Sequence, residues 1–225
     1  MLYTVILVRC IYTFIIMFFN NLNRACVRGI ISLHTIRGLS STLSNRATFG
    51  AGCYWGTEKF MRHDFNKKFA GVVSNGKVGF MGPPGAMENP TYHEVCRGST
   101  QQVEVYDFSF NGDEEVYREL VRWFYSFHDP TIWNQQGNDV GTQYASVIFV
   151  HDHIQGEIAA KETAELQKYM DNSHTSLYQA GQITTLIAPA TIFYPAEEDH
   201  QDYLTKNEGG YCNHRFRFKE WPVVI

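Results

Sequence analysis

Polar and apolar residues alternate through residues 102–110, QVEVYDFSF, so successive side chains would point to opposite faces of a sheet. This period of two predicts a strand with one buried and one exposed face. Shorter apolar runs predict further strands that end at Gly50, begin the segment 71–98 and span residues 144–150 and 183–188. The Gly- and Pro-rich remainder of 71–98 is typical of a long functional loop.

Helical spacing is clearest in residues 114–127, where Val116, Leu120, Val121 and Phe124 share one face. Pro130 forbids continuation of this helix. We also predict a helix at 54–66, an exposed charged helix at 154–170 and a polar helix at 196–207, followed by an irregular C-terminal tail.

This order of strands and helices predicts an α+β fold of two layers, with long functional loops gathered at one edge of the sheet. At 225 residues, with 44% hydrophobic and 19% charged residues, the chain is long enough for one domain with a sizeable core. The formal net charge is -4, but the first 57 residues contain five Arg and no acidic residue. The remainder is therefore strongly acidic, which gives no electrostatic basis for binding nucleic acid.

The first 45 residues differ from the rest of the chain and predict an N-terminal targeting or anchor segment, followed by a catalytic domain at 46–225. Residues 1–19 are strongly apolar but interrupted by Arg9, and the residues that follow are rich in Ser, Thr and Arg. This composition resembles a mitochondrial transit peptide. The alternatives are a secretory signal or membrane anchor, with membrane contact only through residues 1–20, and a cytoplasmic chain whose leader is not used.

Five cysteines are scattered along the chain, and an odd number at irregular spacing argues against a disulfide framework. No C-x-x-C or H-x-x-x-H pair is present, so we expect no metal site. The cysteine pattern fits a reduced compartment and one or more reactive thiols better than it fits a disulfide-stabilised secreted protein.

Cys53 lies in GAGCYWGTEKF, residues 50–60, where a strand meets the predicted helix at 54–66. The free amides of a helix N-terminus stabilise a thiolate, and Gly50 and Gly52 allow a sharp turn and a close approach to a ligand. Tyr54 and Trp55 would then wall a pocket for a methyl thioether. The alternative is that Cys53, Tyr54 and Trp55 are ordinary core residues.

The segment GCYWGTE resembles the active-site signature of the A class of peptide methionine sulfoxide reductases. Four further segments follow in the order of that family, so the resemblance covers residues 47–213: NPTYHEVCRGST, HDPTIWNQQGNDVGTQYAS, ITTLIAPATIFYPAEEDHQDYL and KNEGGYC. The resemblance implies a ferredoxin-like sandwich of a mixed sheet with helices. It also implies reduction of methionine-S-sulfoxide, free or in oxidised proteins, to methionine.

The same resemblance implies roles for individual residues. Cys53 would attack the sulfoxide sulfur, which is electrophilic only when its oxygen is protonated or strongly hydrogen-bonded. Glu104 matches the family's acidic residue, and a water-poor pocket would keep it protonated by raising its pKa. Tyr92 and Tyr144 match the residues that hydrogen-bond the substrate oxygen. Without the resemblance, a solvent-facing strand residue would be the preferred interpretation of Glu104.

Substrate binding and regeneration follow from the resemblance in the same way. Tyr54, Trp55 and Asp139 would bind the methionine. Cys212 would act as the resolving cysteine, condensing with the Cys53 sulfenic acid to a disulfide that thioredoxin or another dithiol reduces. The family implies no bound cofactor, and we expect a monomer.

Several positions depart from the family's pattern: Tyr54 replaces the usual Phe, Gln102 the usual His and Ala145 the usual Arg. These changes leave open a catalytically impaired module that only binds methionine sulfoxide. A second alternative is a Cys-His hydrolase with His63 or His93 as the base.

Overall fold

The structure is a computed structural model that describes residues 39–173 and 176–223. The segment predicted for targeting or anchoring therefore lies outside the described residues as far as position 38. Within the described ranges, no helix is long and apolar enough to cross a membrane.

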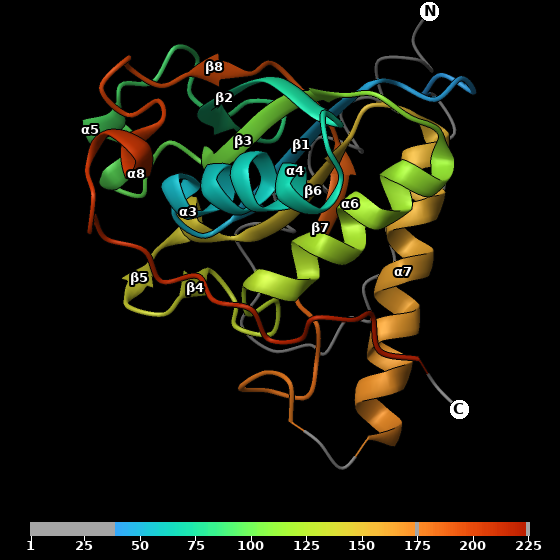
Figure 1. The fold of residues 1–225 in the computed structure, drawn as a ribbon. Helices are drawn as coiled ribbons and strands as arrows, with labels where there is room; N and C mark the ends of the chain where they lie inside the picture. Colours follow the sequence, from blue (N-terminus) through green and yellow to red (C-terminus); the bar gives the residue numbers. More distant parts are fainter. Residues whose placement is uncertain (1–38, 174–175, 224–225) are drawn as a thin grey trace, which may run out of the picture. The chain divides into compact units, whose positions relative to one another are not determined.

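Six strands form one sheet in the order β7-β6-β1-β3-β2-β8 (Figure 1). Neighbouring strands are antiparallel except β6 and β7, which run parallel, so the sheet is mixed. The strands are β1 (Arg46–Ala51), β2 (Val73–Met81), β3 (Val103–Phe110), β6 (Ser146–Val150), β7 (Leu186–Pro189) and β8 (Tyr194–Pro195). A separate hairpin pairs β4 (Gln135–Gln136) with β5 (Asp139–Val140).

Helices α3, α4 and α6 lie over one face of this sheet, with α7 beside α6 (Figure 1). A π-helical stretch, Lys59–Asp64, joins α3 to α4, so residues 54–68 are helical throughout. This arrangement confirms the predicted α+β class. The helices are α3 (Tyr54–Glu58), α4 (Phe65–Lys68), α5 (Tyr92–Cys96), α6 (Glu114–Phe127), α7 (His153–Asn172) and α8 (Tyr203–Lys206), with a 3-10 turn at Thr142–Tyr144.

Strand β3 is buried on both faces, so the prediction of a half-buried strand is wrong. Tyr106 and Phe108 join the core beneath the helices, whereas Val103 and Val105 join a second apolar cluster on the other face. The reason is topological, because β3 lies in the sheet interior between β1 and β2. Its two charged residues, Glu104 and Asp107, are buried and have specific partners. Asp107, for example, accepts two hydrogen bonds from the Arg46 side chain at 2.9 and 3.0 Å.

The polar helix predicted at 196–207 is reduced to α8, which is only four residues long. Asp202 interrupts it, because its backbone is left-handed with φ 55° and its N–H donates to Glu58 Oε2 at 2.9 Å. The strand predicted at 144–150 begins two residues later, because Tyr144 ends the 3-10 turn.

The sequence predicts an exposed, charged helix at α7, but one face of this helix is buried against α6. Glu162 on that face has no solvent exposure and accepts from Arg118 Nη1 at 2.6 Å and Arg122 Nε at 2.8 Å. Local charge did not reveal this ion-pair network, because its arginines come from α6, 40 and 44 positions earlier in the chain.

We expect Glu162→Leu to lower the free energy of unfolding by about 3 kcal/mol, because it leaves two arginines without their buried partner. Urea unfolding followed by circular dichroism measures this change. Glu165→Gln is the matched control on α7, since the Glu165 side chain is 45% exposed and lies 3.9 Å from Lys161. That control is expected to change stability by less than about 0.5 kcal/mol. Equal losses in both variants would show that the buried network does not stabilise the fold.

Candidate active site

Cys53 lies between β1 and α3, and its side chain is buried with 7% exposure. The flanking glycines are required sterically. Gly52 has φ 92°, and a Cβ there would overlap the Gln136 side chain; a Cβ at Gly56 would overlap the ring of His214. The glycines of GAGCYWG therefore let two distant segments approach the cysteine's turn closely.

Glu104 lies on β3 with 1% exposure, pointing to the helix-covered face, and its Oε2 accepts the Tyr54 N–H at 3.0 Å. This bond places the carboxyl beside the residue that follows Cys53. Burial and, to a smaller extent, the charge of Asp139 together raise the pKa of Glu104 to about 8, against the lowering effect of the Tyr54 N–H. The carboxyl is therefore protonated at pH 7, as the resemblance implies.

Burial raises the pKa of the Cys53 thiol well above its ordinary value, and the neighbouring Glu104 raises it further. The backbone amides of Trp55 and Gly56 lower this pKa, as expected of a helix N-terminus, but burial outweighs them. The thiolate expected from helix position alone is therefore not the resting form. Both Cys53 and Glu104 hold their protons in this state.

Tyr92 and Tyr144 come from different segments of the chain, and both lie close enough to Glu104 for its charge to raise their pKa. Tyr92 is the first residue of α5, which begins with a capping box between Thr91 and Glu94. Burial raises the pKa of each tyrosine, so both phenols stay neutral and able to donate a hydrogen bond; in this state the Tyr92 side chain is hydrogen-bonded to Cys96. The structure thus brings Cys53, Glu104 and the two tyrosines into one site.

An aromatic wall adjoins these groups. Trp55 stacks on Tyr203 at 3.7 Å between ring centroids and on His200 at 5.7 Å, and Tyr92 approaches His200 at 4.3 Å. Tyr54 is fully buried, with its hydroxyl unpartnered among the described residues. Sequence reasoning missed His200 and Tyr203, although the aromatic spacing in DHQDYL was the available signal.

Asp139 lies on β5 and is bound to the C-terminal tail. Its two oxygens accept from the Tyr211 hydroxyl at 3.1 Å and the Asn213 amide at 2.9 Å, the residues on either side of Cys212. Burial raises the pKa of Asp139. Cys212 is half-buried and, like Cys53, is a free thiol. The tail, red in Figure 1, passes beside the β4-β5 hairpin and continues along α6.

Two of the substituted positions, Gln102 and Ala145, are buried. Gln102 is buried and its amide donates to the Met87 carbonyl at 2.8 Å, tying down the loop after β2. Ala145 packs in the second apolar cluster. Of the histidines considered for a hydrolase, His63 is engaged by Asp202 at 3.2 Å and His93 lies beside the ring of Tyr92.

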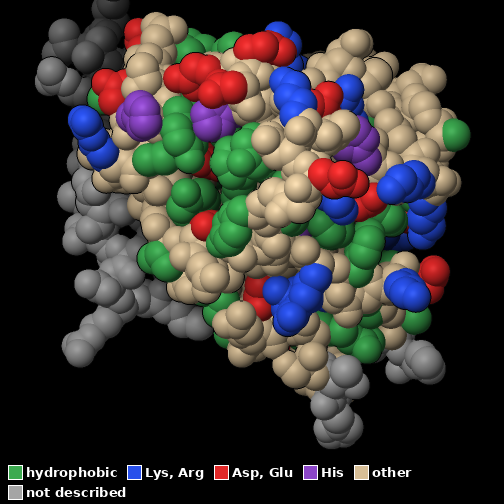
Figure 2. Space-filling model, turned by 60° about the vertical axis from the view of Figure 1, so that its left-hand side comes forward, with side chains coloured by type: hydrophobic (Ala, Val, Ile, Leu, Met, Phe, Trp, Pro, Cys, Tyr) green, Lys and Arg blue, Asp and Glu red, His purple; other side chains and the backbone are tan. Residues whose placement is uncertain are grey.

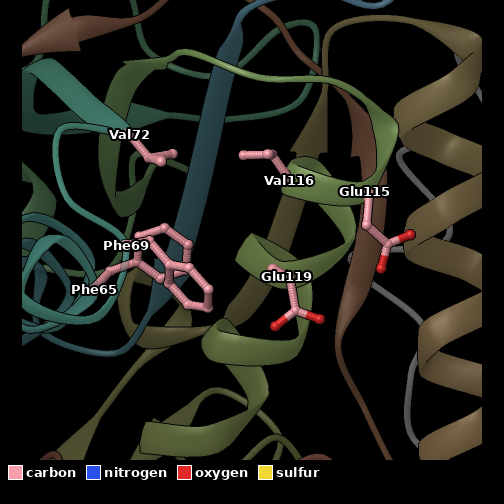
Figure 3. Close-up of a pocket in the computed structure, with 6 residues that line it drawn as sticks. All are labelled: Phe65, Phe69, Val72, Glu115, Val116 and Glu119. Atoms are coloured by element: carbon pink, nitrogen blue, oxygen red, sulfur yellow. The ribbon is translucent and has the colours of Figure 1, made fainter.

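Two hollows can be followed in the views. Figure 2, which brings forward the side of Figure 1 that carries α5 and α8, shows hydrophobic side chains around a hollow that contains acidic groups. A different pocket lies between α4 and α6, and no site residue predicted from the sequence lines it (Figure 3). Its lining consists of Phe65, Phe69, Val72, Glu115, Val116 and Glu119. Among the residues described, no group of three or more His, Cys, Asp or Glu could hold a metal ion.

A buried cysteine, a neutral carboxyl, two neutral phenols and a second free cysteine on a docked tail define a thiol-based oxidoreductase. The family model of peptide methionine sulfoxide reductase matches residues 45–223. The chain belongs to this family, whose members reduce methionine sulfoxide to methionine.

Individual relatives agree with this assignment. The peptide methionine sulfoxide reductase MsrA of Methanothermobacter thermautotrophicus is 46% identical, over 74% of this chain and 90% of its own. The mitochondrial peptide methionine sulfoxide reductase of Rattus norvegicus is 41% identical, over 74% of this chain and 66% of its own. The crystal structure of reduced Mxr1 from Saccharomyces cerevisiae matches with a TM-score of 0.65 and 36% identity, over 77% of this chain and 92% of that one.

Proposed function

We propose that this enzyme reduces methionine-S-sulfoxide, both free and within oxidised proteins, with Cys53 as nucleophile and Glu104 as proton donor. The observation that carries the proposal is the 3.0 Å bond from the Tyr54 N–H to Glu104, which holds a protonated carboxyl next to the buried Cys53. Tyr92 and Tyr144 add neutral donors toward the same oxygen. The aromatic wall of Trp55 and Tyr54 suits the methyl thioether end of the substrate.

The chemistry of the first step balances without a cofactor. The Cys53 sulfur attacks the sulfoxide sulfur, while Glu104 supplies a proton to the sulfoxide oxygen. That oxygen is transferred to the Cys53 sulfur, so methionine leaves and Cys53 becomes a sulfenic acid. The thiol proton of Cys53 restores the carboxylic acid.

Regeneration is proposed to use Cys212, which forms a disulfide with Cys53 that thioredoxin or another dithiol reduces. Asp139 is proposed to bind the methionine backbone. Its oxygens are bonded to Tyr211 and Asn213 in the tail-docked state, so a substrate bound there would share this carboxylate with the tail or replace the tail's bonds.

We also propose that residues 1–45 direct the domain at 46–225 to mitochondria and that the enzyme is a monomer. The acid-free, Arg-bearing sequence of the leader supports the location, as does the mitochondrial name of the rat relative. A fusion of residues 1–45 to a fluorescent protein tests the targeting. Accumulation of the fusion in the secretory pathway or the cytoplasm would reject it.

Turnover of separate S and R epimers of a methionine sulfoxide peptide tests the function, using the full chain with dithiothreitol or with thioredoxin and its reductase. We expect methionine from the S epimer only, with both reductants. Consumption of R would reject the stereochemical assignment. A folded chain that binds the S epimer by calorimetry and releases no methionine would instead be the binding module.

A further inference from the structure

The C-terminal tail is held in place by backbone hydrogen bonds shortly after Cys212. The backbone N–H groups of Arg215 and Arg217 donate to the Phe127 and Ser126 carbonyls at 3.0 and 2.7 Å, so the tail completes the last turn of α6. The ring of Phe216 lies 5.0 Å from that of Phe60. By contrast, residues 207–211 before Cys212 are largely exposed and include two glycines. Cys212 therefore sits where an anchored segment meets an exposed one.

His214 is the buried member of the anchored segment, with 8% exposure. Its Nε2 lies 2.6 Å from the Ala51 carbonyl oxygen, two residues before Cys53, and its ring occupies the space that Gly56 leaves free. Burial lowers the pKa of His214 to about 4, so the ring is neutral at pH 7. The tail is thus docked directly on the turn that carries the nucleophile.

This contact assigns the tautomer of the ring. A carbonyl oxygen can only accept, so Nε2 must carry the single proton of the neutral imidazole, and Nδ1 keeps a lone pair. Nδ1 lies 3.8 Å from Cys212 Sγ, within reach of a thiol donor. The His214 backbone N–H also hydrogen-bonds the Cys212 sulfur, which lowers the pKa of the thiol against the effect of burial. The ring and the backbone of His214 therefore both orient the Cys212 sulfur.

We propose that His214 is the positioning residue of the resolving step: anchored by Ala51, it holds the Cys212 thiol through Nδ1 so that its sulfur is presented toward Cys53. This inference rests on the proposed function. In the step that it serves, Cys212 attacks the sulfenic sulfur, an S–S bond forms and the S–O bond breaks. The Cys212 sulfur is oxidised, the Cys53 sulfur is reduced, and the thiol proton leaves with the hydroxyl as water.

Two variants separate positioning from packing. His214→Gln retains an amide N–H for the Ala51 carbonyl and an oxygen for the thiol, whereas His214→Leu fills the space beside Gly56 without either group. Arg215→Leu is the matched control, because that side chain is exposed and, within the described part of the chain, only the backbone of Arg215 is hydrogen-bonded. Thermal unfolding confirms that each variant is folded.

Rapid quench with mass spectrometry, in the absence of reductant, measures methionine release and Cys53–Cys212 disulfide formation separately. We expect His214→Leu to release its first methionine at the native rate but to form the disulfide at least tenfold more slowly, with a sulfenic acid that dimedone traps. His214→Gln should stay within about threefold of the native rate, and Arg215→Leu should match it. Native disulfide rates in His214→Leu, or equal slowing in the Leu and Gln variants, would overturn the proposal.

The same variants distinguish this inference from the proposed function. If the native chain releases no methionine, the proposed function fails. Hydrogen peroxide then serves as the oxidant that converts Cys53 to its sulfenic acid. The order of disulfide rates predicted for the Leu, Gln and native proteins is then tested without methionine sulfoxide, and a Leu variant as fast as the native protein would reject the role of His214.

Discussion

Replacing Cys53 with serine is expected to abolish reduction of the S epimer, with a loss of more than about 10³-fold in kcat/KM. A serine hydroxyl can fill the same buried position, but it is a far poorer nucleophile toward sulfur, and it cannot form the sulfenic acid or the disulfide that follow. Methionine release measured by chromatography gives the result. Cys96→Ser is the matched control, because Cys96 is an exposed free thiol whose hydrogen bond with Tyr92 a serine hydroxyl can keep, and it should stay within about threefold of native activity.

Dimedone labelling locates the oxidised sulfur independently of rate. In a Cys212→Ser variant the sulfenic acid has no resolving thiol and should accumulate after one turnover. We expect the adduct on Cys53 alone, identified by peptide mass spectrometry. An adduct on Cys96, or methionine release that persists in Cys53→Ser, would contradict the assignment of the nucleophile.

Glu104→Gln is expected to lower kcat for the S epimer by about 10²- to 10⁴-fold, the usual contribution of a positioned general acid. Glutamine fits the same space and can still accept the Tyr54 N–H, so the fold and the pocket should persist. The amide can donate a weak hydrogen bond to the sulfoxide oxygen, but it cannot transfer a proton. Comparison of kcat and KM for the two proteins measures this loss.

The dependence of kcat on pH also tests whether Glu104 is the proton donor. Because the pKa of Glu104 in the folded protein is raised to about 8, its proton is present below that pH and is lost as pH rises through it. Native kcat should therefore fall above about pH 8, whereas the residual activity of Glu104→Gln should lack that fall.

A second buried carboxyl provides the control for the predicted fall of kcat above about pH 8. Burial raises the pKa of Glu58 to about 7, but this residue bonds the Asp202 backbone rather than Tyr54. Glu58→Gln should therefore retain the decline above pH 8. A native profile without that decline, or one that Glu58→Gln removes, would show that Glu104 is not the acid.

The departures from the family pattern have bearing on these outcomes. Gln102 and Ala145 are accommodated by a backbone hydrogen bond and by apolar packing, respectively. The additional hydroxyl of Tyr54 and the side-chain oxygen of Gln102 are both buried without a partner among the described residues. Such a group costs about 1–3 kcal/mol, a cost that a bound substrate's polar atom could offset. Turnover of the native chain decides whether these changes are tolerated.

Local sequence patterns determined the helix at 114–127 to the residue, the strand that precedes Cys53 and the irregular tail. These features depend on side-chain periodicity, glycine and proline, which act within a few positions. The order of five motifs also identified the family and the residues that match its site. For Cys53, however, local reasoning left a stabilised thiolate and an ordinary core residue as alternatives, since a helix N-terminus is visible in the sequence and the degree of burial is not.

Only the tertiary structure decided the burial of Glu104, which local alternation assigned to a solvent-facing position. Both faces of β3 are covered by segments far away in the chain, and this desolvation is what raises the pKa of the carboxyl. The docking of the tail has the same origin. His214 meets Ala51 across 163 positions, and Asp139 meets Tyr211 across 72. Such contacts arise when the sheet and helices bring distant segments together, and no local period encodes them.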